Sequence, residues 1–246
     1  MLRWYHYLME HLLEAIGQYF AGTQHCLALT GSGGKTTAMV KLAEYYAKKN
    51  LRVLVSTTTK LLLPKDREYG CDTYYFDEKV LSHRPVRGER VFYTHVTYKA
   101  VSPPLHHLKT LLDRYDVILL EADGARNLGL KLHQECDPVV PPFVTGTLAI
   151  VSMSLLGKAF EENCFGFGPY LKEFPERTIT LDTYKKLLKH PQGILKRMQG
   201  KSLVLCNQSS EDNLEKYELL ASSLTIPHPI WFGDIQTNQL IYRNPS

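Results

Sequence analysis

The sequence predicts an α/β fold of the P-loop NTPase type: a doubly wound, mainly parallel sheet of about seven strands with helices on both faces. Short apolar runs rich in Val, Leu and Ile recur along the chain without strict polar alternation, which is typical of strands covered on both faces. Helical segments lie between several of these runs, and such alternation favours a parallel sheet. A glycine-rich turn joins the first strand to a long helix, as phosphate-binding loops do.

The elements follow from these patterns in chain order. The predicted strands are the apolar runs at 25–30, 51–57, 90–96, 116–122, 147–154, 201–207 and 228–233. The predicted helices cover 35–49, 105–114, 181–189 and 211–223. In the N-terminal segment 1–24, apolar residues follow helical spacing but charged residues interrupt them, which predicts a helix packed on the domain and not a signal peptide.

Length and composition bound the remaining possibilities. The 246 residues fit one P-loop NTPase-like domain, 1–246, in which 61–89 and 157–180 fit the strand–helix rhythm least and are expected to be insertions over the active face. No apolar run is long enough to span a membrane. The net charge of +4 is mild and scattered, which argues against a nucleic-acid partner. Five distant cysteines indicate neither disulfides nor zinc, so we expect a cytoplasmic protein.

The glycine-rich turn is the strongest functional signal. Its sequence, GSGGKTT, nearly matches the phosphate-binding pattern G-x-x-x-x-G-K-[ST], but Leu29 stands where the first glycine is expected. The turn therefore resembles the T-G-x-x-G-K-T-T loop of the Mur-type peptidoglycan ligases. The alternative is a glycine-rich turn that carries an exposed lysine. The residues predicted to bind nucleotide here are Gly31, Ser32, Gly33, Gly34, Lys35, Thr36 and Thr37.

These residue types suit the binding of a polyphosphate. Glycines adopt positive φ and allow close approach, so successive N–H groups can converge on a phosphate at the positive end of a helix. Lys35 would reach the β- and γ-phosphates, and the Thr36 hydroxyl would hold Mg²⁺. We therefore expect Mg²⁺ and ATP, or another NTP, as the cofactors.

Two carboxylates end the predicted strand 116–122. Glu121 and Asp123 are two residues apart, so they share one side of an extended chain. Acids at the tip of a strand beside a phosphate loop can ligate or anchor Mg²⁺, which predicts Glu121 as the residue that acts on metal or water. Asp123 with Gly124 can form a switch that senses the γ-phosphate. Together with Lys35 they are the candidate catalytic residues; the alternative is a helix cap or a surface charge.

Polar residues at two other strand ends are candidates for binding a substrate. Thr58, Thr59 and Lys60 follow the second strand, whose neighbour Thr57 we assign to the strand itself. Arg126 and Lys131 follow the acidic strand and can pair with an anionic substrate or form salt bridges on a loop. All five of these assignments are hypotheses about one crevice at the carboxyl edge of the sheet.

The end of the sixth predicted strand bears on the choice of base. The sequence there is Asn207-Gln208-Ser209-Ser210, whereas a guanine-specific GTPase has N-K-x-D. Ser210 cannot replace both hydrogen bonds that an aspartate makes to guanine. Asn207 can still contact a base or ribose, but ATP is favoured over GTP.

Taken together, these residues resemble the YqeC-type family, described as accessory proteins of selenium-dependent molybdenum hydroxylases. The resemblance rests on GSGGKTT (31–37), STTTK (56–60), EADGARNLGLK (121–131), HQECDPVVP (133–141) and LLGKAF (155–160). It implies a P-loop nucleotide-binding fold, a cytosolic location, and a molybdenum hydroxylase or its cofactor-maturation proteins as partners. A His-Arg-Pro-like element expected after the fifth strand is missing from 162–170.

The sequence thus predicts a Mg²⁺-dependent NTP hydrolase that serves as an accessory factor in maturing such a hydroxylase. Two alternatives stay open. One is a Mur-like enzyme that activates a small metabolite by phosphoryl or nucleotidyl transfer. The other is a nucleotide sensor that does not turn over.

Overall fold

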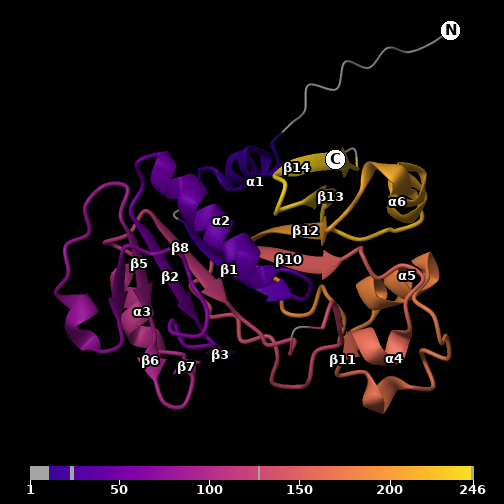
Figure 1. Cartoon of the computed structure of the whole chain (residues 1–246), viewed down its shortest axis with the longest axis horizontal. Coiled ribbons are helices and arrows are strands. Elements are labelled where there is room, and N and C mark those ends of the chain that lie inside the picture. Colours follow the sequence, from indigo (N-terminus) through magenta and orange to yellow (C-terminus); the bar gives the residue numbers. More distant parts are fainter. Residues whose placement is uncertain (1–10, 23–24, 127, 245–246) are drawn as a thin grey trace, which may run out of the picture.

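The computed structural model describes residues 11–22, 25–126 and 128–244, and its main feature is a nine-stranded sheet (Figure 1). The strand order is β14-β13-β12-β10-β1-β8-β2-β5-β4, and every neighbouring pair is parallel except β13 and β14. The strands of this sheet are β1 (His25–Gly31), β2 (Val53–Thr57), β4 (Thr73–Tyr75), β5 (Arg90–Tyr93), β8 (Val117–Glu121), β10 (Gly146–Ser152), β12 (Lys201–Asn207), β13 (Ile230–Asp234) and β14 (Gln239–Arg243).

Two small sheets, six α-helices and three short 3₁₀-helices (Glu78–Leu81, Gly168–Tyr170 and Glu211–Asn213) complete the regular structure of the described residues. One small sheet has the order β3-β7-β6 and the other pairs β9 with β11. Their strands are β3 (Lys60–Leu61), β6 (His95–Val96), β7 (Ala100–Val101), β9 (Leu130–Lys131) and β11 (Cys164–Phe165). The helices are α1 (Leu12–Phe20), α2 (Lys35–Lys48), α3 (Leu105–Leu111), α4 (Phe160–Asn163), α5 (Leu181–Lys189) and α6 (Leu214–Ser222). None of these helices is long and apolar enough to cross a bilayer.

Apolar side chains cover both faces of the main sheet. In β1, Leu27 and Leu29 pack with α1 and α2, whereas Cys26 and Ala28 pack on the opposite face in a cluster that includes α3. A third cluster joins β10, β12 and β13 to α5 and α6. Two-sided burial explains why the strand sequences are apolar without alternation. The predicted α/β fold with a mainly parallel sheet and helices on both faces is confirmed.

All seven predicted strands contribute to this sheet, but its margins differ from the prediction. The run 90–96 is divided, because β5 ends at Tyr93 and the next strand, β6, belongs to the β3-β7-β6 sheet. Two edge strands, β4 and β14, are additional. β4 has only three residues, all half-buried, and β14 pairs on one side only, so neither has the apolar run of a central strand.

The parallel strands end at one edge and thereby gather the polar residues of the sequence motifs. The register places Leu29 of β1 beside Glu121 of β8, and Thr57 of β2 beside the same Glu121. On the other side of β1, Gly31 lies beside Ile150 of β10. The ends of β12, β10, β1, β8 and β2 therefore form one continuous rim in that order.

Candidate functional site

The turn between β1 and α2 has a backbone that requires glycine. Gly31, Gly33 and Gly34 have φ values of 87°, 88° and 123°, a region that other residues rarely adopt. A Cβ atom on Gly33 would lie 2.5 Å from the Cβ of Ser152 and 2.6 Å from its nitrogen. Ser32 fixes the turn by donating its N–H to the Ile150 oxygen at 2.7 Å. The glycines thus let the turn press against the end of β10 and enter α2.

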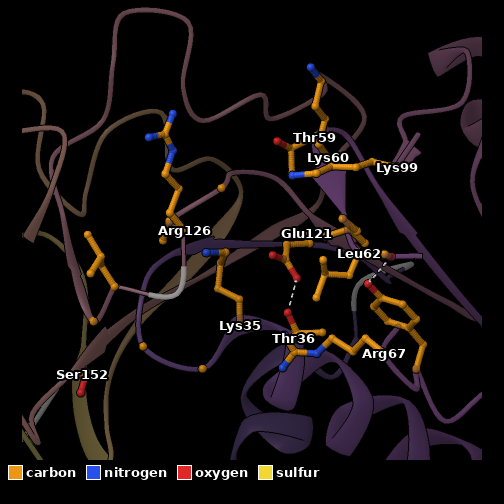
Figure 2. Close-up of a pocket in the computed structure, with 18 of the residues that line it drawn as sticks. Lys35, Thr36, Thr59, Lys60, Leu62, Arg67, Lys99, Glu121, Arg126 and Ser152 are labelled. Carbon is orange, nitrogen blue, oxygen red and sulfur yellow. Dashed lines mark hydrogen bonds between the residues drawn. The ribbon is translucent and has the colours of Figure 1, made fainter. Parts of the chain in front are cut away.

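At the start of α2, a hydroxyl and a carboxylate meet beside this turn. The Thr36 hydroxyl donates a hydrogen bond to Glu121 Oε2 at 2.8 Å, and the Glu121 residue is 7 % exposed (Figure 2). Burial raises the pKa of the Glu121 carboxyl, and Lys35 and Thr36 oppose that rise only in part. The Thr57 hydroxyl donates to the Glu121 backbone oxygen at 2.8 Å, which fixes the strand tip. The arrangement leaves a carboxylate and a hydroxyl available to one hard cation.

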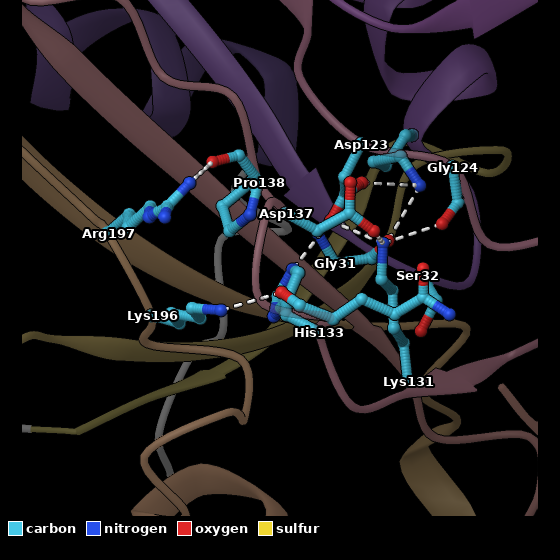
Figure 3. Close-up of polar contacts among 12 residues, drawn as sticks. Gly31, Ser32, Asp123, Gly124, Lys131, His133, Asp137, Pro138, Lys196 and Arg197 are labelled. Carbon is cyan, nitrogen blue, oxygen red and sulfur yellow. Dashed lines mark hydrogen bonds and ion pairs between the residues drawn. The ribbon is translucent and has the colours of Figure 1, made fainter. Parts of the chain in front are cut away.

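Asp123 occupies a different position, beneath the turn, and is fully buried (Figure 3). It accepts the Gly31 N–H at 2.9 Å and forms ion pairs with Lys35 at 3.0 Å and Lys131 at 3.3 Å. His133 Nε2 lies 2.6 Å from Asp123 Oδ2. Burial alone would raise the pKa of Asp123, but Lys35 and His133 outweigh it and hold that pKa below its usual range. Asp123 therefore acts as the anionic anchor of the turn.

Lys35 lies between this anchor and the open pocket. Its Nζ donates to the Gly31 backbone oxygen at 2.6 Å in addition to the Asp123 ion pair, and the residue is 5 % exposed. Burial lowers the pKa of Lys35, but the negative charges of Asp123 and Glu121 overcome this effect and raise it. The lysine is therefore charged. An ammonium has three donors, so one remains for a ligand in the pocket.

The anchor is held in turn by the segment that follows β9. Lys131 is fully buried and pairs with Asp137 at 3.1 Å as well as with Asp123. His133 Nδ1 lies 2.9 Å from the Gly193 oxygen. Arg197 donates to the backbone oxygen of Pro138 (Figure 3) and to those of residues 135 and 136. Lys131, which the sequence predicted to bind a substrate, therefore forms its ion pairs with Asp123 and Asp137 inside the protein.

A pocket of about 1020 Å³ opens above the turn (Figure 2). Its charged lining consists of five cations and one carboxylate, Glu121. The sequence-predicted residues that line it are Gly33, Gly34, Lys35, Thr36, Thr58, Thr59, Lys60, Glu121 and Arg126. The other sequence-predicted residues, Gly31, Ser32, Thr37, Asp123, Lys131 and Asn207, are not among its lining residues. The tertiary structure therefore brings most of the predicted residues to one cavity and places several behind it.

Two of these residues have roles in the wall of the site. The Thr58 hydroxyl donates to the Val139 oxygen at 2.6 Å. Asn207 donates its side-chain N–H to the Gly33 oxygen at 2.8 Å and accepts the Ile235 N–H at 3.0 Å. Both ends of the Asn207 amide are thus engaged by the protein. It braces the glycine turn from β12.

Sequence reasoning missed other residues of the pocket. Arg67 lies in the segment 61–89, and Lys99 precedes β7; both line the pocket, and neither stands in a recognisable motif. Gln208 also lines it, with φ of 56°, and accepts a hydrogen bond from Ser154 at 3.1 Å. His133 begins the stretch 133–141, which resembles the YqeC-type family, but no pattern in the nearby sequence indicates that it contacts Asp123.

The donor set at Thr36 and Glu121 fits Mg²⁺. Within the described ranges, no group of three or more His, Cys, Asp or Glu side chains converges as a cage for a metal. Mg²⁺ does not need one, because it keeps several waters and binds through one or two carboxylates together with the phosphates of its substrate. One hydroxyl and one carboxylate oxygen 2.8 Å apart beside a phosphate-type turn meet that requirement.

Comparison with known proteins identifies one family that this chain matches. A family model described as YqeC protein matches residues 27–167, which include the turn, the acidic strand end and the Asp123 anchor. A protein of Escherichia coli K12 with the printed name "Uncharacterized protein YqeC" is 30% identical over 233 residues, covering 88% of this chain and 90% of its own. No solved structure matches. The chain belongs to the YqeC family.

Proposed function

We propose that the protein is a Mg²⁺-dependent nucleotide-binding protein that hydrolyses ATP or a related NTP. One observation carries the proposal: the Thr36 hydroxyl and the Glu121 carboxylate, 2.8 Å apart, lie at the N-terminus of α2 next to a turn of three positive-φ glycines. This is a hard-cation site placed where backbone N–H groups and the helix dipole favour a phosphate.

The residues of the site have different proposed roles in phosphoryl transfer to water. The remaining Lys35 donor binds the terminal phosphates, while Asp123 and the Gly31 oxygen fix the direction of its side chain. Thr36 and Glu121 hold the cation, and bound Mg²⁺ supplies charge neutralisation on the phosphate oxygens. In addition, the Glu121 carboxylate can orient a water molecule for attack, which makes it the residue on which hydrolysis depends.

Adenine is a better fit than guanine at the β12 end. Both ends of the Asn207 amide contact the protein. Ser210, at the place of the guanine-binding aspartate, caps the short helix Glu211–Asn213 through a bond to the Asp212 N–H at 3.4 Å. Neither residue offers the carboxylate that reads guanine. Gln208, Ser152 and Ser154 are instead the polar groups beside the pocket at this end.

We propose an accessory role in maturing a selenium-dependent molybdenum hydroxylase as the cellular setting. Membership of the YqeC family supports this role, and the resemblance of 31–37, 121–131 and 133–141 to that family includes the residues of the site itself. The proposed partners are the hydroxylase or the proteins that mature its cofactor, in the cytoplasm.

A thermal-shift screen tests the binding step. ATP, GTP, CTP and UTP are each added with and without Mg²⁺, since a ligand bound only by the native state adds about 2.7 kcal/mol at one hundred times its Kd. We expect the largest shift for ATP with Mg²⁺. No shift with any nucleotide would contradict the proposal.

Product analysis then separates hydrolysis from the other functions. Release of free phosphate without a modified metabolite indicates an NTPase. A phosphorylated or adenylylated metabolite indicates a transferase, which the surplus of cations in the pocket specifically favours. Binding without turnover, even in the presence of partner proteins, indicates a sensor.

A further inference from the structure

The pocket is chemically asymmetric about the glycine turn. The rim order β12-β10-β1-β8-β2 puts Ser152 and Gln208 on one side of Lys35, and Thr58, Thr59 and Lys60 on the other. The first side presents hydroxyls and an amide. The second side also receives Arg67 and Lys99, so it is cationic. We call this side of the pocket, lined by Lys60, Leu62, Arg67, Tyr98 and Lys99, the cationic half.

The cationic half is built by paired elements. β3 begins at Lys60, with only Thr58 and Thr59 between it and the end of β2, and it pairs antiparallel with β7, which follows Lys99. The register of Lys60 with Val101 brings the two lysines to the same part of the rim, and Figure 2 shows them together across the pocket from Arg126. In the same view Arg67 lies near Thr36, at the glycine-turn end of the pocket.

These three cations form no ion pair with a carboxylate within the described residues, although burial raises the pKa of Glu121 and the charge of Arg67 helps to lower it. Lys60 contacts the Tyr98 hydroxyl at 3.2 Å, and no ion pair joins Lys60, Arg67 or Lys99 to a carboxylate there. Arg52 and Arg90, by contrast, each form a two-point pair with an aspartate. Glu121 is the one carboxylate among the described residues that line the pocket, and it accepts the hydrogen bond of Thr36.

A nucleoside triphosphate bound at the glycine turn does not account for the positive charges of the cationic half. With Mg²⁺, Lys35 and the N-terminus of α2 at its phosphates, most of its charge is already compensated at the turn. The cationic half also contains apolar surface: Leu62 is 42 % exposed and Tyr98 is 74 % exposed, and both line the pocket. Exposed apolar groups within a pocket are where the carbon skeleton of a ligand is buried.

We propose that the cationic half binds a second substrate, a small organic anion that carries a phosphate or carboxylate group. The anionic group lies on Lys60 and Lys99, and its apolar body lies on Leu62 and Tyr98. The proposal rests on the proposed function in that a nucleotide occupies the turn next to this substrate.

Phenyl phosphate and benzoate are suitable probes, because each has one anionic group and one apolar ring. Binding is measured by isothermal titration calorimetry with and without a non-hydrolysable ATP analogue and Mg²⁺. The variants are the double substitution Lys60→Ala with Lys99→Ala, and a control, Lys109→Ala with Lys172→Ala, which removes two exposed lysines away from the pocket.

We expect at least one probe to bind the nucleotide-loaded protein. The Lys60 and Lys99 substitutions are expected to weaken it about tenfold or more, while the control keeps its affinity within about threefold. The probe that binds more tightly identifies phosphate or carboxylate as the preferred group. Affinity for the nucleotide itself is expected to stay within about threefold in both double variants.

The two proposals fail in distinguishable ways. If the nucleotide binds but neither probe does, or if both double variants weaken the probe equally, the second-substrate site is overturned and the nucleotide site stands. If the nucleotide does not bind, the proposed function fails, and the probe titrations without nucleotide still decide the cationic half. Loss of the probe only in the Lys60 and Lys99 variant supports it, and equal binding by all proteins overturns it.

Discussion

Two acids close together in sequence have separate tasks in the folded protein. Glu121 faces Thr36 at the pocket, whereas Asp123 is fully buried among Lys35, Lys131 and His133. The difference arises because Asp123 follows the last β8 residue by two positions and passes beneath the turn, where the buried Lys35 requires a counter-charge. At the scale of single residues, Glu121 is therefore the candidate for chemistry and Asp123 the candidate for positioning.

Substitution of Lys35 tests the phosphate contact directly. Lys35→Ala is expected to weaken nucleotide binding about 10- to 100-fold or more, because a charge-assisted hydrogen bond to phosphate is lost. The control is Lys48→Ala on the same helix, which removes only an exposed pair with Glu44. Calorimetric titration with ATP and Mg²⁺ measures both. An unchanged dissociation constant in Lys35→Ala would refute the assignment of the turn.

The raised pKa of Glu121 predicts how metal binding depends on pH. Only the ionised carboxylate holds Mg²⁺, so the affinity for Mg²⁺ with nucleotide is expected to fall as the pH falls through a value above 4.5. Glu121→Gln should retain nucleotide binding, lose hydrolysis, and lose this pH dependence. Titrations of Mg²⁺ at fixed nucleotide, taken from neutral pH down to 4.5, the ordinary pKa of this side chain, measure it. Full hydrolysis in Glu121→Gln would remove Glu121 from the mechanism.

At the scale of elements, the turn between β1 and α2 works because the neighbouring strand ends leave no room for side chains. Gly31 lies against the Ile150 oxygen, Gly33 against Ser152, and Gly34 against the Asn207 amide. The contacts come from β10 and β12, which are distant in sequence. The glycine content of the turn is therefore explained by sheet packing, in addition to the proposed phosphate binding.

Alanine substitutions test the contribution of packing at the turn. Gly33→Ala is expected to destabilise the protein by about 1–3 kcal/mol, because φ of 88° disfavours alanine and the new Cβ would collide with the Ser152 backbone. Gly168→Ala is the control, since a Cβ there meets nothing within 4 Å. Urea unfolding followed by circular dichroism measures both. Equal stabilities of the two variants would show that the turn relaxes to accept a side chain.

At the scale of the whole molecule, a buried charge network links the glycine turn to a segment that is distant in sequence. Lys131 joins Asp123 to Asp137, and His133 joins Asp123 to the Gly193 oxygen after α5. Through these contacts, β9 and the 190–197 segment both contact the base of the site (Figure 3). We therefore expect that weakening this network destabilises the whole domain, because its members come from several elements.

Lys131 is the residue that tests this view. Lys131→Met would leave two carboxylates near one another without their shared cation, and removing one partner of a buried pair costs about 3–5 kcal/mol. Lys158→Met, at an exposed lysine, is the matched control. Free energies of unfolding in urea provide the measurement. A loss no greater than that of the control would mean that Lys131 does not support the turn.

The sequence alone determined the class of the fold and the order of its central elements. Strands covered on both faces must be apolar throughout, so β1, β2, β8, β10 and β12 are evident from composition. Short edge strands such as β4 and β14 lack that constraint, and the strands β3, β6 and β7 have only two residues each, so no periodicity marks them. Local pattern also indicated the turn and Glu121, because their chemistry is encoded within a few adjacent residues.

Only the tertiary structure decided which charges face a ligand and which face one another. Lys60 and Lys131 each follow the end of a predicted strand, so the sequence does not distinguish them. In the structure, however, Lys60 lines the pocket and Lys131 is fully buried between two aspartates. Lys99 joins Lys60 at the pocket through the pairing of β3 with β7, at a separation that no local motif spans, and Arg67 reaches the pocket from the segment after β3. The physical reason is that pairing of charges depends on distance in space, which strand order and register set, and not on distance along the chain.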